Sequence, residues 1–378
     1  MVSNILVIGA SGGAIVARQL SESLPPTHRL ILIERLNFAY HPISSLRGAV
    51  IPGFEENNFA SFDNFFDKGS RHVVLSGTEV TKLGEDSVTI SGEFEESNTI
   101  PFDYACLALG ATYPVPGRPR STSKEEGLEN QRQMQRDIKA AKSILVVGGG
   151  PVGVEFVGEV RTQYPKSTGK AITLATSGGE LIPGGWKKSL GQKIHTLLTS
   201  EGIDIKYNAK VNLPEDVEVG KLLPTLRSFE LPDGGKVEAD FVVMATGGKP
   251  NTSLVKQDHP EALNDMGLIK VEPTTLRVLD PKLGKYFAMG DCSDSPGPNT
   301  YFAVMQQAPV VVAHMNALAQ GKGKASKAYK EPMNVMVVPF GPSQGHGQIG
   351  PFVMGSWVTS LGKGKTLFVP DFKKLYRV

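Results

Sequence analysis

The segment Ser143-Ile-Leu-Val-Val-Gly148-Gly-Gly150-Pro-Val-Gly153-Val-Glu155 decides the fold of this 378-residue chain. An apolar strand leads into a glycine-rich turn, and a helical pattern follows. Glycines at 148, 150 and 153 form the dinucleotide-binding fingerprint, because they permit a tight turn and let a pyrophosphate approach the helix N-terminus. A second strand at 171–176 completes a βαβ unit, and Thr176 falls where such units contact the ribose.

A weaker copy of this pattern opens the chain. An apolar strand at 5–8 leads into a glycine-rich turn at 9–14, and the next strand ends in an acidic residue. The small residues permit the turn and close approach of a pyrophosphate, while the carboxylate is placed to accept hydrogen bonds from an adenosine ribose. We expect the cofactor-binding residues of this unit to be Gly9, Ser11, Gly12, Gly13, Glu34 and Arg35.

Each unit is closed by a short apolar strand that ends in small residues. The first closing strand ends near Gly110 and the second near Gly247. The fingerprint turns, from 9 to 148, are 139 residues apart, and the closing turns, from 110 to 247, are 137 apart. Two signals that recur at nearly one offset indicate an internal duplication, so both closing turns are expected to line a dinucleotide.

A third strand, at 284–289, delivers Asp291 at its end. A carboxylate in this place accepts hydrogen bonds from the ribityl hydroxyls of a flavin, although a lone Gly-Asp pair is more often a simple turn. A helix is expected to begin near Asn299 and to direct its N-terminus at a flavin. Tyr301 and Gln306 are then wall residues of the site or ordinary packing residues.

Composition excludes several classes of protein. Forty basic and 38 acidic residues give a net charge of +2, which offers no reason to expect nucleic acid as a partner. The two cysteines, Cys106 and Cys292, are too few for a zinc or iron–sulfur site, and the histidines lack ligand spacing, so no metal is expected. Val2 excludes N-myristoylation, and no apolar run is long enough for a membrane helix. We therefore expect a cytoplasmic protein.

Several stretches resemble one family. They are Tyr40-His41-Pro-Ile-Ser-Ser-Leu-Arg47, the second fingerprint through Glu155, Gly290-Asp-Cys, and Thr366-Leu-Phe-Val369. Over nearly its whole length the chain is similar to the pyridine nucleotide–disulfide oxidoreductase fold, and within it to the ferroptosis suppressor and apoptosis-inducing-factor-like (AMID) group. The resemblance implies an α/β protein with two Rossmann-like domains of the glutathione-reductase type and a small C-terminal α+β domain.

The resemblance also implies cofactors and boundaries. FAD is expected on residues 1–114 and 255–322, NAD(P)H on 115–254, and the C-terminal domain at 323–378. Arg47 and Val80 match FAD contacts of the group. Members pass a hydride from NAD(P)H to FAD and then reduce quinones. A paired-cysteine motif beside the flavin is absent, so we expect electrons to pass directly to an acceptor.

Glu155, Lys363 and Tyr301 are the expected catalytic residues. Glu155 falls in the first turn of the second fingerprint helix, where it would orient the nicotinamide or merely complement the helix dipole. Lys363 matches a lysine in the tail of the ferroptosis-suppressor group. No acid follows the strand at 171–176, so NADH and NADPH both remain open; Lys187 and Lys188 would neutralise a 2′-phosphate or simply be solvated.

The tail from Trp357 to Val378 interleaves apolar and basic residues. This pattern suits peripheral contact with an anionic membrane surface, where lipid-soluble quinones are found, or packing on the protein itself or on a twin subunit of a homodimer. The main expectation is an FAD-dependent NAD(P)H:quinone oxidoreductase. The alternatives are an apoptosis-inducing-factor-like flavoprotein with a binding or signalling role and a flavoenzyme acting on a dedicated small metabolite.

Overall fold

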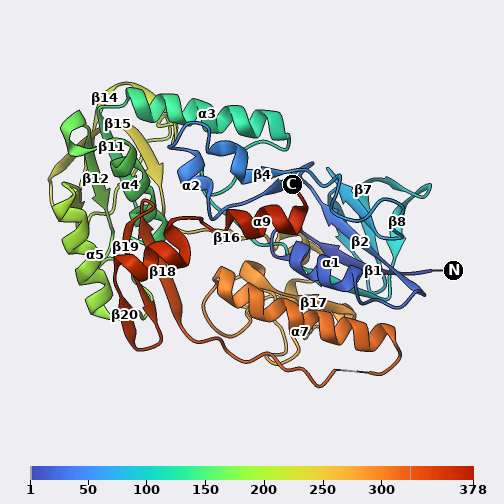
Figure 1. Cartoon of the computed structure of the whole chain (residues 1–378). Coiled ribbons are helices and arrows are strands. Elements are labelled where there is room, and N and C mark those ends of the chain that lie inside the picture. Colours follow the sequence, from blue (N-terminus) through green and yellow to red (C-terminus); the bar gives the residue numbers. More distant parts are fainter. Residues whose placement is uncertain (1, 324) are drawn as a thin grey trace.

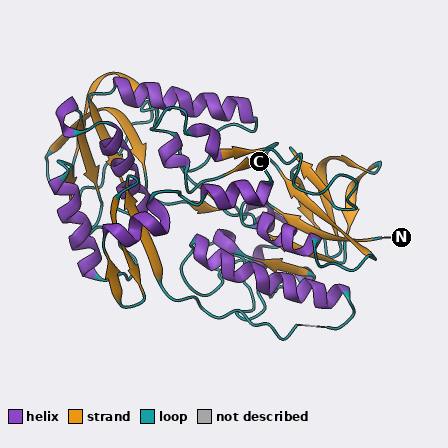
Figure 2. Cartoon of the chain, viewed as in Figure 1, coloured by secondary structure: helices purple, strands orange, loops and turns teal. Residues whose placement is uncertain are grey.

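The computed structural model describes residues 2–323 and 325–378. Two parallel-sheet units lie side by side, and the last part of the chain crosses between them (Figure 1). Helices lie against both sheets (Figure 2). This is the α/β architecture with two Rossmann-like units that the duplicated fingerprint predicts. Among the described residues, no helix has the length and apolar character needed to cross a membrane.

The first unit is built on a five-stranded parallel sheet. Its strand order is β17 (Tyr286–Ala288), β9 (Tyr104–Leu107), β1 (Ser3–Ile8), β2 (His28–Glu34) and β5 (Val73–Ser76). Strands β1 and β2 read as near-continuous apolar runs because both faces of a parallel sheet are covered. The helices α1 (Gly13–Ser21) and α7 (Tyr301–Ala319) pack on each other, and an antiparallel sheet of β6 (Val80–Leu83), β7 (Ser87–Phe94) and β8 (Ser97–Pro101) joins the same core.

The second unit repeats the plan. Its order is β13 (Asp204–Lys206), β12 (Ala171–Ala175), β11 (Ser143–Val147), β15 (Lys236–Met244) and β14 (Leu222–Glu230), and only β14 runs antiparallel. The fingerprint strand β11 is central in its sheet, as β1 is in the first. The helices of this unit are α3 (Lys124–Ala140), α4 (Pro151–Gln163) and α5 (Lys188–Ser200).

Two short strands join the units. β10 (Ala111–Thr112) leaves the first unit and pairs antiparallel with β16 (Lys249–Pro250), which returns to it. The Asn251 side chain secures the crossing, because its Nδ2 donates to the Leu109 carbonyl at 2.9 Å and its Oδ1 accepts from the Thr112 hydroxyl at 2.6 Å. Both crossings follow the closing turns recognised in the sequence, so the duplicated turns also form the link between the units.

The C-terminal segment divides between the two units. The antiparallel strands β18 (Val335–Phe340), β19 (Gln344–Ile349) and β20 (Phe352–Met354) pack on α4 and α5 of the second unit. The chain then passes through α8 (Ser356–Thr359) and the π-helical turn η6 (Ser360–Gly364) and crosses back, so that α9 (Val369–Tyr376) lies against α1 (Figure 1). The stretch expected as one small domain therefore contacts both halves of the molecule.

Short elements complete the chain. They are β3 (Ala39–Tyr40), α2 (Ser45–Gly48), η1 (Glu55–Asn58), β4 (Phe59–Ala60), η2 (Lys166–Thr168), α6 (Ser253–Asp258), η3 (Pro260–Ala262), η4 (Pro281–Leu283) and η5 (Gly290–Cys292).

Candidate active site

Two adjoining cavities lie where the units and the tail meet. The smaller, of about 380 Å³, surrounds the first fingerprint, and the larger, of about 440 Å³, extends from that fingerprint to α4. Ser11, Tyr40 and Tyr113 line both. The residues predicted from sequence that line one or both cavities are Gly9, Ser11, Gly12, Glu34, Arg35, Gly110, Glu155, Gly247, Asp291, Tyr301 and Lys363.

The turn at the first fingerprint has the shape that a dinucleotide requires. Gly9 has a φ of +95°, and a Cβ there would overlap the carbonyl oxygen of Ala108. The Glu34 carboxylate lies at the end of β2, where it accepts hydrogen bonds from the Ala10 N–H at 2.7 Å and the Leu36 N–H at 3.0 Å. The acid is thus fixed at the cavity wall, where the adenosine half of FAD would lie. The close backbone packing and the cavity fit this cofactor.

Asp291 lies on the larger cavity and accepts a hydrogen bond from the Tyr113 hydroxyl at 2.8 Å. The amide that binds nearby is not the one expected. Gln307 accepts from the Gly290 N–H at 2.8 Å, whereas the side chain of Gln306 is exposed and lines neither cavity. The two neighbours differ because consecutive residues on a helix differ in direction by about 100°, and the role of Gln306 stays a prediction.

The second fingerprint has similar geometry. Gly148 has a φ of +128°, and a Cβ there would overlap the carbonyl oxygen of Ala245. A Cβ at Gly150 would meet nothing within 4 Å, so the N-terminus of α4 is open to a ligand. Thr176 is buried against Gly149, and Gly153 and Gly13 pack inside their own units. None of these residues lines the two cavities, so their assignment to a nucleotide stays a prediction.

Two ion pairs occupy successive turns of α4. Lys363 of η6 donates to Glu155 Oε1 at 2.6 Å, and Arg47 of α2 donates twice to Glu159, at 2.7 and 2.9 Å. Burial raises the pKa of Glu155, while the ammonium of Lys363 opposes that shift. The two acids therefore attach α4 to the C-terminal segment and to α2, whose Leu46 shares the hydrophobic core of the second unit.

Arg47 and Val80 were expected as FAD contacts, and these roles stay predictions. The guanidinium of Arg47 is bound by Glu159 and also donates to the carbonyl of Gly364 at 2.8 Å. Val80 begins β6, and its side chain is buried in the core of the first unit. Neither residue lines a cavity. Arg47 is thus paired with a buried carboxylate, and the side chain of Val80 packs in the core of the first unit.

Aromatic rings form one wall of the larger cavity. Tyr301, the first residue of α7, stacks on Phe368 with ring centroids 5.1 Å apart. Burial raises the pKa of Tyr301, so its phenol is neutral at physiological pH. Phe302 meets Phe368 edge-on at 6.0 Å. The wall presents flat apolar rings with one hydroxyl.

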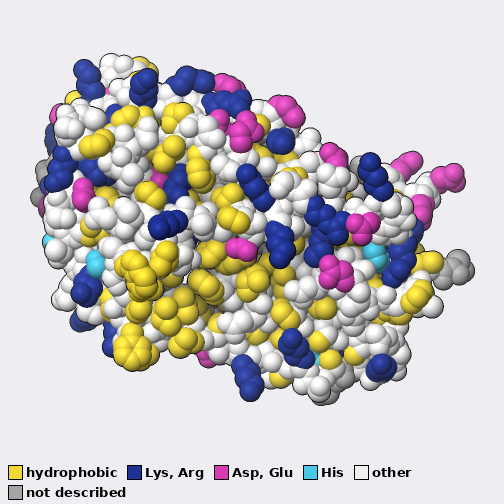
Figure 3. Space-filling model, in the orientation of Figure 1, with side chains coloured by type: hydrophobic (Ala, Val, Ile, Leu, Met, Phe, Trp, Pro, Cys, Tyr) yellow, Lys and Arg dark blue, Asp and Glu magenta, His cyan; other side chains and the backbone are white. Residues whose placement is uncertain are grey.

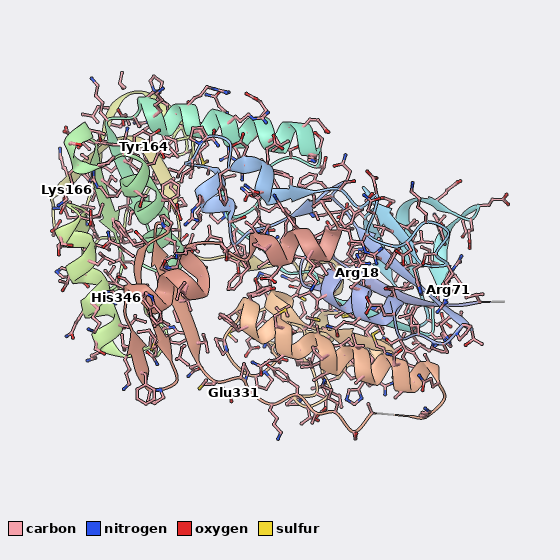
Figure 4. All side chains as sticks on the ribbon, in the orientation of Figure 1. Arg18, Arg71, Tyr164, Lys166, Glu331 and His346 are labelled. Atoms are coloured by element: carbon pink, nitrogen blue, oxygen red, sulfur yellow. The ribbon has the colours of Figure 1, made fainter. Side chains whose placement is uncertain are left out.

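Helix α9 closes the site from the opposite end of the sequence. The Tyr376 hydroxyl donates to the Ala10 carbonyl at 2.8 Å, and Phe372 stacks on His41 at 4.7 Å. Arg18, labelled in Figure 4 beside α9, donates to the carbonyl of Leu375 at 2.8 Å. Tyr376 and Tyr113 are site residues that sequence reasoning missed. Tyr113 follows the recognised closing turn directly, whereas nothing in the sequence links position 376 to position 10.

Thiol chemistry has little support in the geometry. Cys106 and Cys292 are both free and buried, and burial raises the pKa of both thiols, that of Cys292 to about 11. A thiol with so high a pKa is protonated and unreactive at neutral pH. Over residues 2–323 and 325–378, no group of three or more acidic, histidine or cysteine side chains is arranged to hold a metal ion.

The chain is similar to several known proteins over most of its length. The chain is 27% identical to human ferroptosis suppressor protein 1 over 99% of its own length and 95% of that protein. It is 26% identical to apoptosis-inducing factor homolog B of Dictyostelium discoideum, over 97% and 95%. It is 30% identical to Fe-regulated protein 8 of Mycosarcoma maydis, over 85% and 82%.

Solved structures and a family model agree with these relatives. The sulfide:quinone oxidoreductase of Aquifex aeolicus matches with a TM-score of 0.75 and 17% identity, covering 99% of this chain and 91% of that one. The model for pyridine nucleotide-disulphide oxidoreductases matches residues 3–317. The chain therefore belongs to the pyridine nucleotide-disulphide oxidoreductase family, as an FAD-dependent NAD(P)H oxidoreductase.

Proposed function

We propose that this protein reduces a quinone with electrons from NAD(P)H, by way of FAD and without a redox-active disulfide. The observation that carries the proposal is the larger cavity. Aromatic and aliphatic side chains line most of it, and the Lys363–Glu155 pair supplies a buried polar end. A lipophilic ring fits such a wall, and a buried ammonium suits an oxygen that gains negative charge.

Bound FAD supplies the redox chemistry, since it takes a hydride from a nicotinamide and releases two electrons to an acceptor. The protein's own groups bind, orient and move protons. Quinone reduction consumes one proton beyond the hydride, and Lys363 holds a proton at Nζ beside the cavity. Glu155 keeps this ammonium in place through the 2.6 Å hydrogen bond. The Tyr301 hydroxyl on α7 is a second proton-bearing group beside the cavity.

Four residues of the second βαβ unit keep their predicted role in binding the nicotinamide nucleotide. Gly148, Gly150, Gly153 and Thr176 are proposed to hold NAD(P)H at the open N-terminus of α4. No acid follows β12, so either nicotinamide nucleotide is accepted under this proposal. The proposed division of the chain keeps 1–114 with 255–322 for FAD, 115–254 for NAD(P)H, and 323–378 as the C-terminal part. Peripheral membrane contact and a homodimer are the proposed assemblies.

The test is anaerobic stopped-flow of the holoprotein with NADH, then NADPH, then a short-chain ubiquinone. We expect rapid bleaching of the flavin absorbance and rapid recovery when quinone is added. Bleaching without recovery would refute the quinone as acceptor and favour a dedicated small metabolite. Absence of bleaching with both nucleotides would refute the oxidoreductase assignment and favour a binding or signalling role.

A further inference from the structure

Tyr113 lies at the crossing between the two units. It directly follows β10, whose Thr112 pairs with Lys249 of β16, so Tyr113 is opposite Gly248 where the chain returns to the first unit. A Cβ at Gly248 would lie 2.6 Å from Cε1 of the Tyr113 ring, and a Cβ at Gly117 would lie 3.1 Å from the Tyr113 Cβ. Two glycines thus leave room for one aromatic side chain, and packing holds the ring at the crossing.

The hydroxyl of Tyr113 is bound to Asp291. It donates to Asp291 Oδ2 at 2.8 Å, and both residues line the larger cavity. Within residues 2–323 and 325–378, no other group donates a hydrogen bond to this carboxylate, so Oδ1 is left for a ligand. Burial raises the pKa of Tyr113, and the Asp291 carboxylate adds to this effect while Arg118 opposes it. The phenol therefore keeps its proton at physiological pH and acts as a donor.

The surroundings of this hydrogen bond are mostly apolar. On the face drawn in Figure 3, hydrophobic side chains gather over β18 and β20 and continue toward the junction of the two units. Aromatic and aliphatic residues, among them Met244, Met289 and Val304, line most of the larger cavity. Charge is poorly screened in such surroundings, so a hydrogen bond to the Asp291 carboxylate alters its effect on a neighbouring group more than it would in water.

A carboxylate has two oxygens and can accept from two donors on different sides. Because the phenol of Tyr113 binds Oδ2, it restricts the rotation of the Asp291 carboxylate and leaves Oδ1 for a ribityl hydroxyl of FAD. The same hydrogen bond disperses negative charge on the carboxylate. Less negative charge beside the flavin favours the reduced cofactor, which carries two additional electrons.

We propose that Tyr113 is a positioning residue that holds Asp291 against the ribityl chain of FAD and raises the reduction potential of the bound flavin. The proposal deepens the proposed function at the same site, and it rests on that function only for the place of Asp291 beside FAD. Because the ring packs on Gly248, the returning crossing supports the hydrogen bond. Two other roles compete with this one, namely direct contact of the hydroxyl with FAD and packing alone.

The test compares the midpoint potential and the FAD affinity of holoprotein variants. The potential is measured at saturating FAD by slow anaerobic reduction with xanthine oxidase against a reference dye, so this readout needs neither nicotinamide nucleotide nor quinone. Tyr113→Phe removes only the hydroxyl and keeps the ring on Gly248. The matched control, Tyr286→Phe, removes a hydroxyl of the same unit that donates to the Gly84 carbonyl at 2.7 Å, and Tyr286 lines neither cavity.

We expect Tyr113→Phe to weaken FAD binding about 3- to 10-fold. It should also disfavour reduced FAD relative to oxidised FAD by a factor of about 3 to 10, which lowers the potential of this two-electron couple by about 15–30 mV. Gly248→Ala forces the ring to move while the hydroxyl is kept, so it should shift the potential in the same direction. In the Asp291→Asn background, Tyr113→Phe should change the ratio by less than about twofold. Tyr286→Phe should leave the potential unchanged.

A wild-type potential in Tyr113→Phe would overturn the proposal, because packing alone would then account for the residue. A shift that persists in full in the Asp291→Asn background would also overturn it, since the hydroxyl would then act on FAD directly. Unchanged potential and affinity in Asp291→Asn itself would separate the carboxylate from the cofactor and refute the role of Tyr113 with it. A shifted potential in a protein that fails to reduce quinone would refute the proposed function and leave the role of Tyr113 standing.

Discussion

Removing either member of the Arg47–Glu159 pair should weaken the contact between α2 and α4. The side chains are only 5% and 3% exposed, and two hydrogen bonds of 2.7 and 2.9 Å join them across the units. Replacing Glu159 with Leu leaves a buried guanidinium with no counter-charge, which costs about 3–5 kcal/mol in such settings. The carbonyls of Gly364 and Lys365 remain as acceptors, so we expect the lower end of that range.

A double-mutant cycle distinguishes the interaction energy of the Arg47–Glu159 pair from the packing that each substitution removes. Arg47→Met should cost a similar amount, because it leaves the Glu159 carboxylate buried, whereas Arg47→Met/Glu159→Leu should lie within about 1 kcal/mol of the wild type. Urea titrations followed by the fluorescence of Trp186 and Trp357 give the free energies of unfolding. The exposed pair Arg136–Glu129 is the control, with a much smaller coupling.

The reasoning is refuted if the single variants lose less than about 1 kcal/mol, or if the double variant loses the sum of both. The same double variant tests the resemblance-based role of Arg47. A stable double variant that retains FAD would show that the guanidinium serves the contact between units. A stable double variant purified without FAD would instead support the role first expected from the family resemblance.

Three further predictions concern the site. Burial lowers the pKa of His41 to about 4, below its ordinary 6.5, so acidification from about pH 6.5 to 4 protonates the unfolded chain first. Acidification over this range should remove up to about 3 kcal/mol from the free energy of unfolding. In urea titrations His41→Gln should make this free energy less dependent on pH, and an unchanged pH dependence would contradict the prediction. Tyr376→Phe keeps the ring but removes the hydrogen bond to the Ala10 carbonyl, so FAD should bind roughly 3- to 10-fold more weakly by fluorescence titration; unaltered affinity would show that α9 does not secure the fingerprint. Glu155→Gln keeps the shape but removes the counter-charge of Lys363, so kcat/KM for quinone should fall about 10²-fold, and an unchanged value would remove the pair from catalysis.

The sequence was sufficient to predict the features that depend on local pattern. The strands expected before the two fingerprints, before the two closing turns and before Asp291 are found as β1, β11, β9, β15 and β17. A glycine turn after an apolar strand has few other folds available. The helix expected near residue 299 is found as α7. Which of its side chains face the cavity depends on packing against α1, which no local pattern encodes.

Contacts between distant segments were beyond prediction from pattern alone. Tyr376 and Ala10 are 366 positions apart, and their hydrogen bond depends on how far the chain travels between β20 and α9. The partner of Arg47 was also out of reach, because Glu159 is 112 positions away in the sequence. The contact of Arg47 with FAD stays a prediction.

The C-terminal segment contributes exposed rings, a partner for Glu155 and a contact with the first fingerprint. Phe352 and Trp357 of this segment are exposed. Lys363, in the turn after α8, donates to Glu155, and the Tyr376 hydroxyl donates to the Ala10 carbonyl in the first fingerprint. These groups share one continuous stretch with no independent core of its own, since β18 packs on α4 and α9 packs on α1. The π-helical turn at 360–364 therefore lies between groups that bind Glu155 of α4 and groups that hold the first fingerprint, which are otherwise far apart in the sequence.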